Sequence, residues 1–478
     1  MKNFSQNISD YFLQLYDNKF VADYENYASQ EVKTYIRILF KENDKLKLIQ
    51  NLGKYGIELQ HLEEIPSVLL VKNGNDVIGK TIEYILGHYY IQSLSSMLPP
   101  ILLNPNPTDK VLDLCAAPGS KTTQLADLMN YRGELYSNEV NPKRIRSLIN
   151  NVERFNLINT AVLFHKGENL CNTYNNYFDK ILVDAPCSGL GILNKFEEIN
   201  KWWSVDHIER LQQLQFHLLV SATKMVKVGG EIIYSTCTMT VEENEELINK
   251  IINKYPLELV DIKLPVKSHN GFNNYQDNKF SDELARTKRI IPWEINSEGF
   301  FIAKLIKTDQ MQKNIHHFER SKITEYLLNS KKKNIVNHLM DLSEYYGIPE
   351  QAFQNFKYIV RKNDIYFVND DWYEDEIQNF YKFGLQLGYL DNHGRANLYY
   401  NGVKTLGEYA TNNVIYLSNR NELEIFFTGG IIKNINETLG QKIVKYNDYF
   451  IGTAVMTKDG LKSQFPKALR SQMIVFPE

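Results

Sequence analysis

The sequence predicts an α/β protein built around a parallel β-sheet with helices on both faces. Between residues 110 and 236, apolar runs typical of buried strands alternate with helical stretches. The runs are KVLDLC (110–115), GELYSN (133–138), AVLFH (161–165), KILVDA (180–185) and EIIYST (231–236). The helical stretches span 121–130, 141–156 and 206–227, and in the last one Ile208, Leu211, Leu214, Leu218 and Leu219 share one face.

The alternation of strands and helices stops after residue 255. Two further apolar runs follow at 257–263 and 299–307, with a long polar stretch between them. We expect these runs to close the sheet as an antiparallel hairpin. The predicted catalytic region is therefore 101–307.

The flanking regions have different patterns. Residues 1–100 mix helical and strand signals, with strands expected at 35–39 and 68–71 and a helix at 45–55, and are interpreted as a small α+β subdomain. Pro99-Pro100 should break any helix there. Residues 308–354 are interpreted as a basic helical linker, and residues 355–478 as a β-rich domain.

Composition excludes several protein classes. No stretch of the 478 residues approaches the ~20 apolar residues of a membrane helix. The N-terminus has no apolar signal core, so we expect a cytoplasmic protein. The four cysteines never form C-x-x-C, which disfavours a zinc site and a disulfide framework. We expect no metal.

A net charge of −3 means that any polyanion must be held by local basic patches. The cluster Lys331-Lys332-Lys333 is one candidate. Such a cluster is more often a solvated helix face, but in an RNA-binding protein the binding role becomes the more frequent one.

The first strand–helix junction, LDLCAAPGSKTTQLA (112–126), predicts a cofactor loop. Small side chains there let backbone N–H groups and a helix N-terminus approach a ligand closely, and Lys121 adds a positive charge. The alternative is a tight turn that needs Gly119. Neither a Walker loop nor G-x-G-x-x-G is present, which counts against a dinucleotide.

Acidic residues follow three other strands of the predicted sheet. Glu139 lies 20 residues after Gly119, where a carboxylate can accept hydrogen bonds from ribose hydroxyls. Glu168 and Asp184 end two further strands. A lone strand-end glutamate usually faces solvent, but the carboxyl ends of parallel strands meet at the edge where ligands of open α/β folds bind.

Two of the four cysteines also fall at this edge. DAPCSGLG (184–191) places Cys187 just past one strand, and YSTCTMTVEEN (234–244) places Cys237 just past another. Each alone is more often a core residue, but two together in such loops suggest reactive groups. Thr240 and Glu243 have the spacing of a capping box, so a helix should start there.

A thiolate, an acid and a methyl donor in one cleft suit methylation of carbon 5 of a pyrimidine. Addition of a thiolate to ring carbon 6 makes carbon 5 nucleophilic. An acid near ring nitrogen 3 stabilises the charge pushed there, and a second group helps to remove the carbon-5 proton and expel the thiol. Asp184, Cys187 and Cys237 meet these needs if they converge.

At this point four motifs identify a family. CAAPGSKT, DAPCSGLG, STCT followed by EEN, and EGFFIA resemble the RNA cytosine-5 methyltransferases of the NOL1/NOP2/Sun family, over about 30–306 and more loosely beyond. The resemblance implies a Rossmann-like class I S-adenosylmethionine-dependent methyltransferase domain and an RNA-binding N-terminal subdomain. The family's N-terminal Arg-x-Asn appears as Arg37-Ile38-Leu39. KDGLKSQFPKALR (458–470) is similar to part of a PUA-like RNA-binding domain.

The resemblance also implies residue roles. Cys237 would be the nucleophile, Cys187 would assist product release, Asp184 would contact the cytosine ring and Pro186 would shape the loop. The cofactor S-adenosyl-L-methionine would contact Cys115, Ala116, Ala117, Pro118, Gly119, Lys121, Glu139, Arg144, Glu168 and Asp184. In this set Glu139 would bind the ribose, and Glu168, where the family usually has Asp, would lie beside the adenine.

The implied substrate is a cytidine of RNA, above all of 16S ribosomal RNA or the small ribosomal subunit, flipped out of its stack. Three alternatives stay open: a transfer RNA substrate, an inactive RNA-binding ribosome-assembly factor, and a nucleotide-dependent oxidoreductase, which the missing glycine pattern disfavours. We expect a monomer with no membrane partner.

Overall fold

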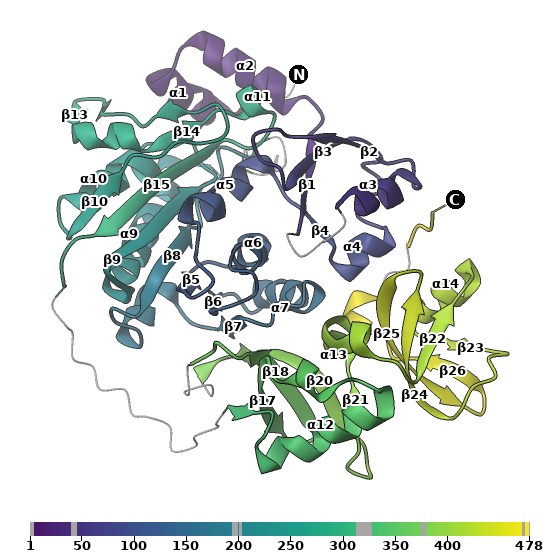
Figure 1. Cartoon of the computed structure of the whole chain (residues 1–478). Helices are drawn as coiled ribbons and strands as arrows, with labels where there is room; N and C mark the ends of the chain where they lie inside the picture. The colour runs from purple at the N-terminus through teal and green to yellow at the C-terminus, as the bar shows by residue number, and fades with distance from the viewer. Residues whose placement is uncertain are drawn as a thin grey trace.

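The computed structural model describes residues 4–39, 45–193, 199, 203–311, 327–373, 379–470 and 474–477. Its centre is a ten-stranded sheet in which nine strands follow the order β11-β14-β15-β9-β8-β5-β6-β7-β19, while β10 pairs with β15 (Figure 1). Four smaller sheets and the remaining helices surround this sheet. The predicted α/β class is confirmed.

The five predicted strands of the α/β core are present. They are β5 (Lys110–Asp113), β6 (Glu134–Asn138), β7 (Thr160–Leu163), β8 (Phe178–Asp184) and β9 (Val226–Thr236), all paired in parallel. The predicted helices are α6 (Ser120–Leu128), α7 (Arg144–Arg154) and α9 (Val205–Met225). The chain runs outward from β5 in one direction to β7 and then returns to β8 on the other side. Ligands of open α/β sheets bind at this switch point.

The antiparallel closure of the sheet is also present, with more strands than predicted. β15 (Phe300–Lys307) pairs antiparallel with β9, and β10 (Leu257–Val260) pairs antiparallel with β15. The stretch between them is not a simple hairpin loop, because β14 (Lys288–Ile290) and β11 (His269–Asn270) extend the sheet. It also holds the two-stranded pair β12 (Asn274–Tyr275) and β13 (Asn278–Lys279), and α11 (Pro292–Ile295).

The N-terminal hundred residues divide into two groups. A four-stranded antiparallel sheet, β2-β3-β1-β4, carries α3 (Lys45–Gly53) and α4 (Ile82–Leu86). Its strands are β1 (Thr34–Ile38), β2 (Glu58–His61), β3 (Val68–Asn73) and β4 (Tyr89–Ile91). In contrast, α1 (Gln6–Leu15) and α2 (Asn18–Ala28) pack against Leu190, Trp203 and Met239 of the catalytic region. In Figure 1, α1 and α2 lie above α5 (Leu94–Leu103), and the four-stranded sheet lies to its right.

Arg37 fastens β1 to the catalytic region. Its guanidinium is buried and donates to Thr123 Oγ1 at 2.8 Å, and it forms an ion pair with Asp127 at 3.4 Å. Burial lowers the pKa of Arg37, and the nearby Asp127 partly offsets this. Arg37, which matches the arginine of the family's Arg-x-Asn pattern, therefore points into the protein.

The expectation that Pro99-Pro100 would break a helix is wrong. Both prolines lie inside α5 (Leu94–Leu103). A proline removes one backbone N–H and leaves a carbonyl four residues earlier without its helical partner. Gln92 Nε2 donates to the carbonyl of Ser96 at 3.1 Å, which satisfies the group that Pro100 leaves open.

The C-terminal region contains two five-stranded sheets rather than one β-rich unit. The first comprises β16 (Leu328–Asn329), β17 (Phe356–Arg361), β18 (Asp364–Asn369), β20 (Leu385–Leu390) and β21 (Ala396–Leu398), with α13 (Tyr400–Leu406) nearby. The second comprises β22 (Val414–Leu417), β23 (Ile431–Ile432), β24 (Gly440–Tyr446), β25 (Tyr449–Thr457) and β26 (Gly460–Ser463), with α14 (Arg420–Thr428).

The segment interpreted as a linker is largely part of the first C-terminal sheet. Residues 312–326 lie outside the described part of the chain. In the rest, β16 pairs with β17, and α12 (Lys333–Tyr346) buries Ile335, Leu339 and Leu342. Lys331, Lys332 and Lys333 are exposed at the start of this helix. Residues 327–354 therefore pack with the C-terminal region.

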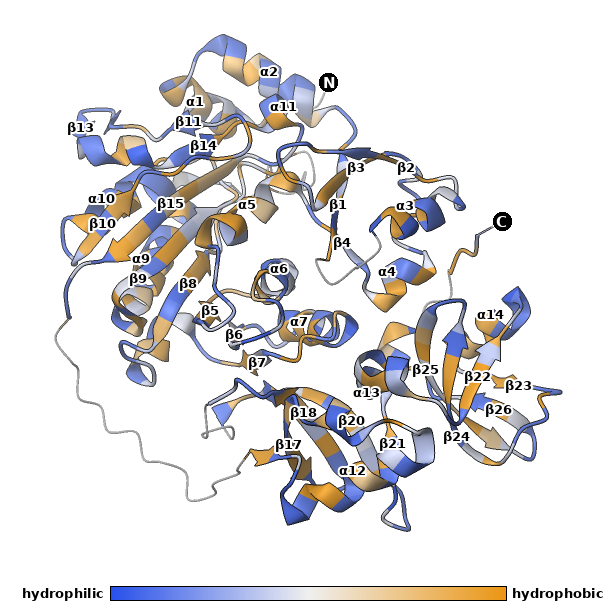
Figure 2. Cartoon of the chain, viewed as in Figure 1, coloured by the Kyte–Doolittle hydropathy of each residue, from blue (hydrophilic) through white to orange (hydrophobic). Residues whose placement is uncertain are grey.

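That region also reaches into the catalytic sheet. The short strand β19 (Lys382–Phe383) pairs antiparallel with β7 and covers that edge. Hydrophobic residues are frequent in the strands of the central sheet, whereas peripheral helices such as α2 and α12 alternate between hydrophilic and hydrophobic residues (Figure 2). Within the described ranges, no helix combines the length and hydrophobicity of a membrane span.

Candidate active site

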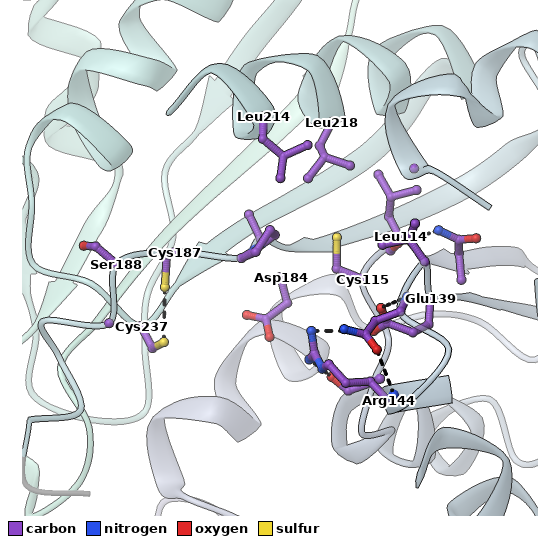
Figure 3. Close-up of a pocket in the computed structure, with 18 of the residues that line it drawn as sticks. Leu114, Cys115, Glu139, Arg144, Asp184, Cys187, Ser188, Leu214, Leu218 and Cys237 are labelled. Carbon is purple, nitrogen blue, oxygen red and sulfur yellow. Dashed lines mark hydrogen bonds and ion pairs between the residues drawn. The ribbon is translucent and has the colours of Figure 1, made fainter. Parts of the chain in front are cut away.

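A cavity of about 570 Å³ lies at the carboxyl ends of the parallel strands (Figure 3). It brings together nine of the residues singled out from the sequence: Cys115, Ala117, Glu139, Arg144, Glu168, Asp184, Pro186, Cys187 and Cys237. A second cavity of about 400 Å³ adjoins it and is lined by Ala116, Pro118 and Lys121. Cys115, Ala117, Arg144 and Asp184 line both cavities, so the two form one continuous region.

Gly119 lines neither cavity, and its role is conformational. It has a positive φ of 106°, and a Cβ there would lie 3.1 Å from Leu148 Cδ1. Glycine thus permits both the turn from β5 into α6 and the close packing of α7. The alternative reading of Gly119 as a turn residue is correct for this position, while its neighbours line the cavities.

Cys187 and Cys237 lie side by side in the wall of the cavity, with their sulfur atoms 3.2 Å apart (Figure 3). Each follows its strand, β8 or β9, as the sequence indicated. The loops meet at Gly191, whose N–H donates to the carbonyl of Cys237 at 2.9 Å. A Cβ at Gly191 would lie 2.7 Å from that carbonyl oxygen, so only glycine allows the contact.

The two thiols are not equivalent. The hydrogen bond with Cys237 raises the pKa of Cys187, and burial and the charge of Glu243 raise it further. A thiol with a raised pKa keeps its proton. The protonated Cys187 thiol can donate a hydrogen bond to the sulfur of Cys237.

Asp184 lies between the cysteines and the loop after β5 (Figure 3). One carboxylate oxygen accepts a hydrogen bond from Ser235 Oγ at 2.8 Å, and the other accepts from Lys121 Nζ at 2.6 Å. Lys121 also donates to Ser96 Oγ at 2.8 Å. Burial acts to lower the pKa of Lys121, but the carboxylate of Asp184 outweighs burial and raises it. The positive charge predicted in the loop is thus committed to Asp184.

The other end of the cavity is lined by acidic and apolar side chains of the kind that suit a nucleoside. The side chain of Glu139 is only 4% exposed, and its carboxylate accepts the N–H of Asn141 at 2.7 Å and lies 3.7 Å from the Arg144 guanidinium. Arg144 also donates to the carbonyl of Ala117. A buried carboxylate on the cavity wall suits ribose hydroxyls, and the apolar walls formed by Val140 and Leu218 suit a base. Glu168, on the short 3₁₀ turn Gly167–Asn172, completes this end.

The predicted capping box at Thr240 forms differently. Thr240 Oγ1 donates to the Glu243 carboxylate at 2.7 Å, so the two side chains bond each other instead of the helix backbone. A π-helical turn (Glu242–Glu246) precedes α10 (Leu247–Ile252). A helical segment does start here, as predicted. The carboxylate of Glu243, however, accepts hydrogen bonds from Ser188 and Gln215 in the protein interior and does not cap the helix.

Sequence reasoning missed several residues of this region. Asn138 Nδ2 donates to the carbonyls of Leu114 and His165, both at 3.1 Å, and joins the ends of β5 and β7. Asp113 is fully buried and lines the second cavity. Burial raises the pKa of Asp113 to about 7, despite a hydrogen bond from Thr122. The sequence signal that could have identified Asp113 as a site residue was its position at the end of β5. Among the described residues, no group of three or more His, Cys, Asp or Glu side chains is arranged to hold a metal ion.

Comparison with known proteins agrees with this geometry. Residues 100–306 match the family model described as 16S rRNA methyltransferase RsmB/F. A tRNA (cytosine(49)-C(5))-methyltransferase of Pyrococcus abyssi is 38% identical over 229 residues, which cover 48% of this chain and 73% of the archaeal protein. The chain belongs to the RNA (cytosine-C5) methyltransferase family that includes RsmB and RsmF.

Other members of this family match different shares of the chain. A "Ribosomal RNA small subunit methyltransferase F" of Shewanella piezotolerans is 28% identical over 483 residues, covering 98% of each protein. The 26S rRNA (cytosine-C(5))-methyltransferase nsun-1 of Caenorhabditis elegans is 37% identical over 265 residues, but the chain spans only 40% of its length. A solved methyltransferase homologue from Pyrococcus horikoshii has a TM-score of 0.57 at 30% identity, covering 64% of this chain and 95% of that protein.

Proposed function

We propose that this protein transfers a methyl group from S-adenosyl-L-methionine to carbon 5 of a cytidine in RNA, with 16S ribosomal RNA or the small subunit as the favoured substrate. The observation that carries the proposal is the convergence of Cys237, Cys187 and Asp184 in one cavity with Glu139. Full-length similarity to a protein named for the small ribosomal subunit supports the substrate. Ribosomal RNA as substrate would place the reaction in the cytoplasm.

The cofactor would occupy the cavity between the loop after β5 and Glu139. S-adenosylmethionine supplies an electrophilic methyl group when bound. The carboxylate of Glu139 would accept hydrogen bonds from the ribose hydroxyls, with Arg144 holding that carboxylate in place. Cys115 and Ala117 would let the ligand approach the backbone, and Glu168 would lie near the adenine.

Catalysis would begin with addition of the Cys237 thiolate to ring carbon 6 of the flipped cytosine. The new C–S bond pushes electron density to carbon 5 and toward ring nitrogen 3. Asp184 would relay a proton from the ammonium group of Lys121, 2.6 Å away, to nitrogen 3. Carbon 5 would then form its bond to the methyl group as the sulfonium–methyl bond breaks, and the neutral thioether S-adenosylhomocysteine would leave.

Release would reverse the addition. The carbon-5 proton passes to solvent, its electron pair restores the carbon 5–carbon 6 double bond, and the C–S bond breaks. The proton on nitrogen 3 returns through Asp184 to Lys121. The sulfur of Cys237 regains a negative charge, and the Cys187 thiol, 3.2 Å away, would donate a hydrogen bond to it. This gives Cys187 its role in release.

The flanking regions would hold the RNA. The β1–β4 subdomain and the second C-terminal sheet, proposed as PUA-like, adjoin the catalytic region. Around the β25–β26 turn, Lys458, Lys462 and Lys467 are exposed and suit phosphates. Arg470 instead donates to the carbonyl of Phe465, which gives it a structural role.

Methylation assays with different RNAs test the proposed reaction and its substrate. Purified protein incubated with S-adenosylmethionine and 16S rRNA transcripts, small subunits or total tRNA should yield 5-methylcytosine, detected by mass spectrometry of nucleosides, in one ribosomal substrate. Methylation of tRNA alone would favour the transfer RNA alternative. No methylation of any RNA, although S-adenosylmethionine raises the melting temperature, would favour the assembly factor.

Substitution of each cysteine should give opposite results. Cys237→Ala should abolish the covalent enzyme–RNA adduct, whereas Cys187→Ala should accumulate it as a slow band on a denaturing gel. Adduct formed by Cys237→Ala would overturn the assignment of the nucleophile.

A further inference from the structure

Glu243 is a buried carboxylate that the proposed reaction does not use. It is fully buried and accepts hydrogen bonds from four donors. One oxygen accepts the N–H of Ser188 and Nε2 of Gln215, both at 2.9 Å. The other accepts from Thr240 Oγ1 at 2.7 Å and from the hydroxyl of Ser188. A carboxylate this deeply buried needs such a complete set of donors to be tolerated.

Two of these donors come from the residue next to Cys187. Ser188 bonds Glu243 through both its backbone N–H and its hydroxyl, and the hydroxyl lies 2.8 Å from Thr238 Oγ1. Gln215 Nε2, on α9, also donates to the carbonyl of Pro186 at 2.8 Å. Glu243 therefore fixes the loop of Cys187 on both sides of the cysteine.

The adjacent residue, Asn244, holds the loop of Cys237 in the same way. Its Oδ1 accepts from Thr236 Oγ1 at 2.7 Å, and its Nδ2 donates to the carbonyl of Thr238 at 3.1 Å. Thr236 and Thr238 are the residues on either side of Cys237. Asn244 is fully buried, as are both threonines.

Both residues belong to the π-helical turn Glu242–Glu246. Such turns are rare and frequently occur at functional sites. Consecutive residues of this turn reach two separate loops that follow two neighbouring strands. The turn therefore holds both cysteine loops at once.

We infer that Glu243 and Asn244 are positioning residues with separate tasks: Glu243 sets the Cys187 loop for product release, and Asn244 sets the Cys237 loop for attack. This inference rests on the proposed two-cysteine reaction. Neither residue lines the cavity, so both act through the cysteines. The charge of Glu243 also contributes to the raised pKa of Cys187, which agrees with a thiol kept in its protonated form.

Variants at the two positions should therefore fail at different steps. Glu243→Ala should accumulate the enzyme–RNA adduct as Cys187→Ala does, with turnover reduced about tenfold or more. Glu243→Gln should restore most of the release, because its amide keeps the shape and the hydroxyls of Ser188 and Thr240 can rotate to accept. Asn244→Ala should instead reduce the amount of adduct, also in the Cys187→Ala background.

The adduct should be measured on denaturing gels with the full chain, in parallel with turnover and melting temperature. Glu246→Gln is the matched control, because Glu246 lies in the same turn but pairs with Lys250 at 2.5 Å on a more exposed side. If Glu243→Ala does not fold, Ser188→Ala tests the same loop and should accumulate adduct. Thr236→Val tests the Cys237 loop in place of Asn244→Ala and should reduce the amount of adduct.

The results separate the inference from the proposed function. If Cys187→Ala accumulates adduct but Glu243→Ala and Asn244→Ala lose adduct and turnover in parallel with melting temperature, the turn is merely structural and the inference is wrong. If Cys187→Ala itself yields no adduct, the proposed reaction is wrong. A Cys187→Ala/Glu243→Ala double variant should have no more adduct than Cys187→Ala alone.

Discussion

Two buried ion pairs in the catalytic region have the same chemistry but different surroundings. Arg289 and Glu245 lie 2.5 Å apart, and their side chains are 2% and 0% exposed. Lys121 and Asp184 lie 2.6 Å apart, but Asp184 is 27% exposed and lines both cavities. The first pair is sealed by Phe272, whose ring lies 4.4 Å below the Arg289 guanidinium.

The same kind of interaction therefore serves two purposes in this protein. The sealed pair is out of reach of a substrate, and its hydrogen bonds from Arg289 to the carbonyl of Met239 and from the N–H of Phe272 to Glu245 also lie within the protein. An open pair can exchange its partner for a substrate. We therefore expect changes to the first pair to affect stability, and changes to the second to affect turnover.

The largest effect should come from breaking the sealed pair. Arg289→Met should lower the free energy of unfolding by about 3–5 kcal/mol, because Glu245 is left as an uncompensated buried charge. Urea unfolding measures this change. An Arg289→Met/Glu245→Leu double variant should recover part of the loss. A change below about 1 kcal/mol in the single variant would contradict the distinction between the two pairs.

Breaking the open pair should mainly reduce catalysis. Asp184→Asn keeps the shape of the side chain but removes proton delivery, and should lower turnover by about 10²–10⁴-fold. Its free energy of unfolding should fall by less than that of Arg289→Met, by about 1–3 kcal/mol, because the new amide oxygen can still accept a hydrogen bond from the buried Lys121. Single-turnover methylation assays and urea unfolding should be compared on the same preparations. Equal losses in both would show that this pair is structural too.

A third effect concerns Asp113, the buried neighbour of the open pair. Its folded-state pKa of about 7 exceeds the usual carboxyl value, so the folded state keeps a proton that the unfolded state releases. This stabilisation is complete at low pH and is lost as pH rises from about 4 to about 7, by up to about 1.4 kcal/mol per pH unit. Asp113→Asn should flatten this part of the stability–pH curve in urea unfolding. An unchanged slope would exclude Asp113 as the titrating group.

The smallest effect should come from an exposed pair. Arg132 lies 2.6 Å from Asp371 and is 58% exposed, and it links the end of α6 to the C-terminal region. Asp371→Asn should cost at most about 1 kcal/mol, and salt should reduce the difference. Urea unfolding at low and high ionic strength tests this. A loss as large as that of Arg289→Met would mean that exposure does not rank these pairs.

The sequence predicted the catalytic sheet well because its strands are short, strongly apolar and separated by amphipathic helices. Sequence-based prediction was wrong where contacts elsewhere in the fold outweighed the local pattern. Pro99-Pro100 lies inside a helix because Gln92 satisfies a freed carbonyl. The linker was misread because the apolar face of α12 has a partner, β21, far along the chain. Strand β19 was missed because two residues carry too little pattern to predict pairing.

Sequence alone was enough to predict the family motifs, the strand ends that carry Glu139, Asp184, Cys187 and Cys237, and the turn at Gly119. These features are local, and a motif read along the chain contains them. The contacts between these features are visible only in the folded chain: the two sulfur atoms lie 3.2 Å apart, Lys121 is paired with Asp184, and Glu243 and Asn244 reach separate loops. Those contacts join residues about 50 or more positions apart, or depend on a π-helical turn, and no spacing in the sequence specifies such distances.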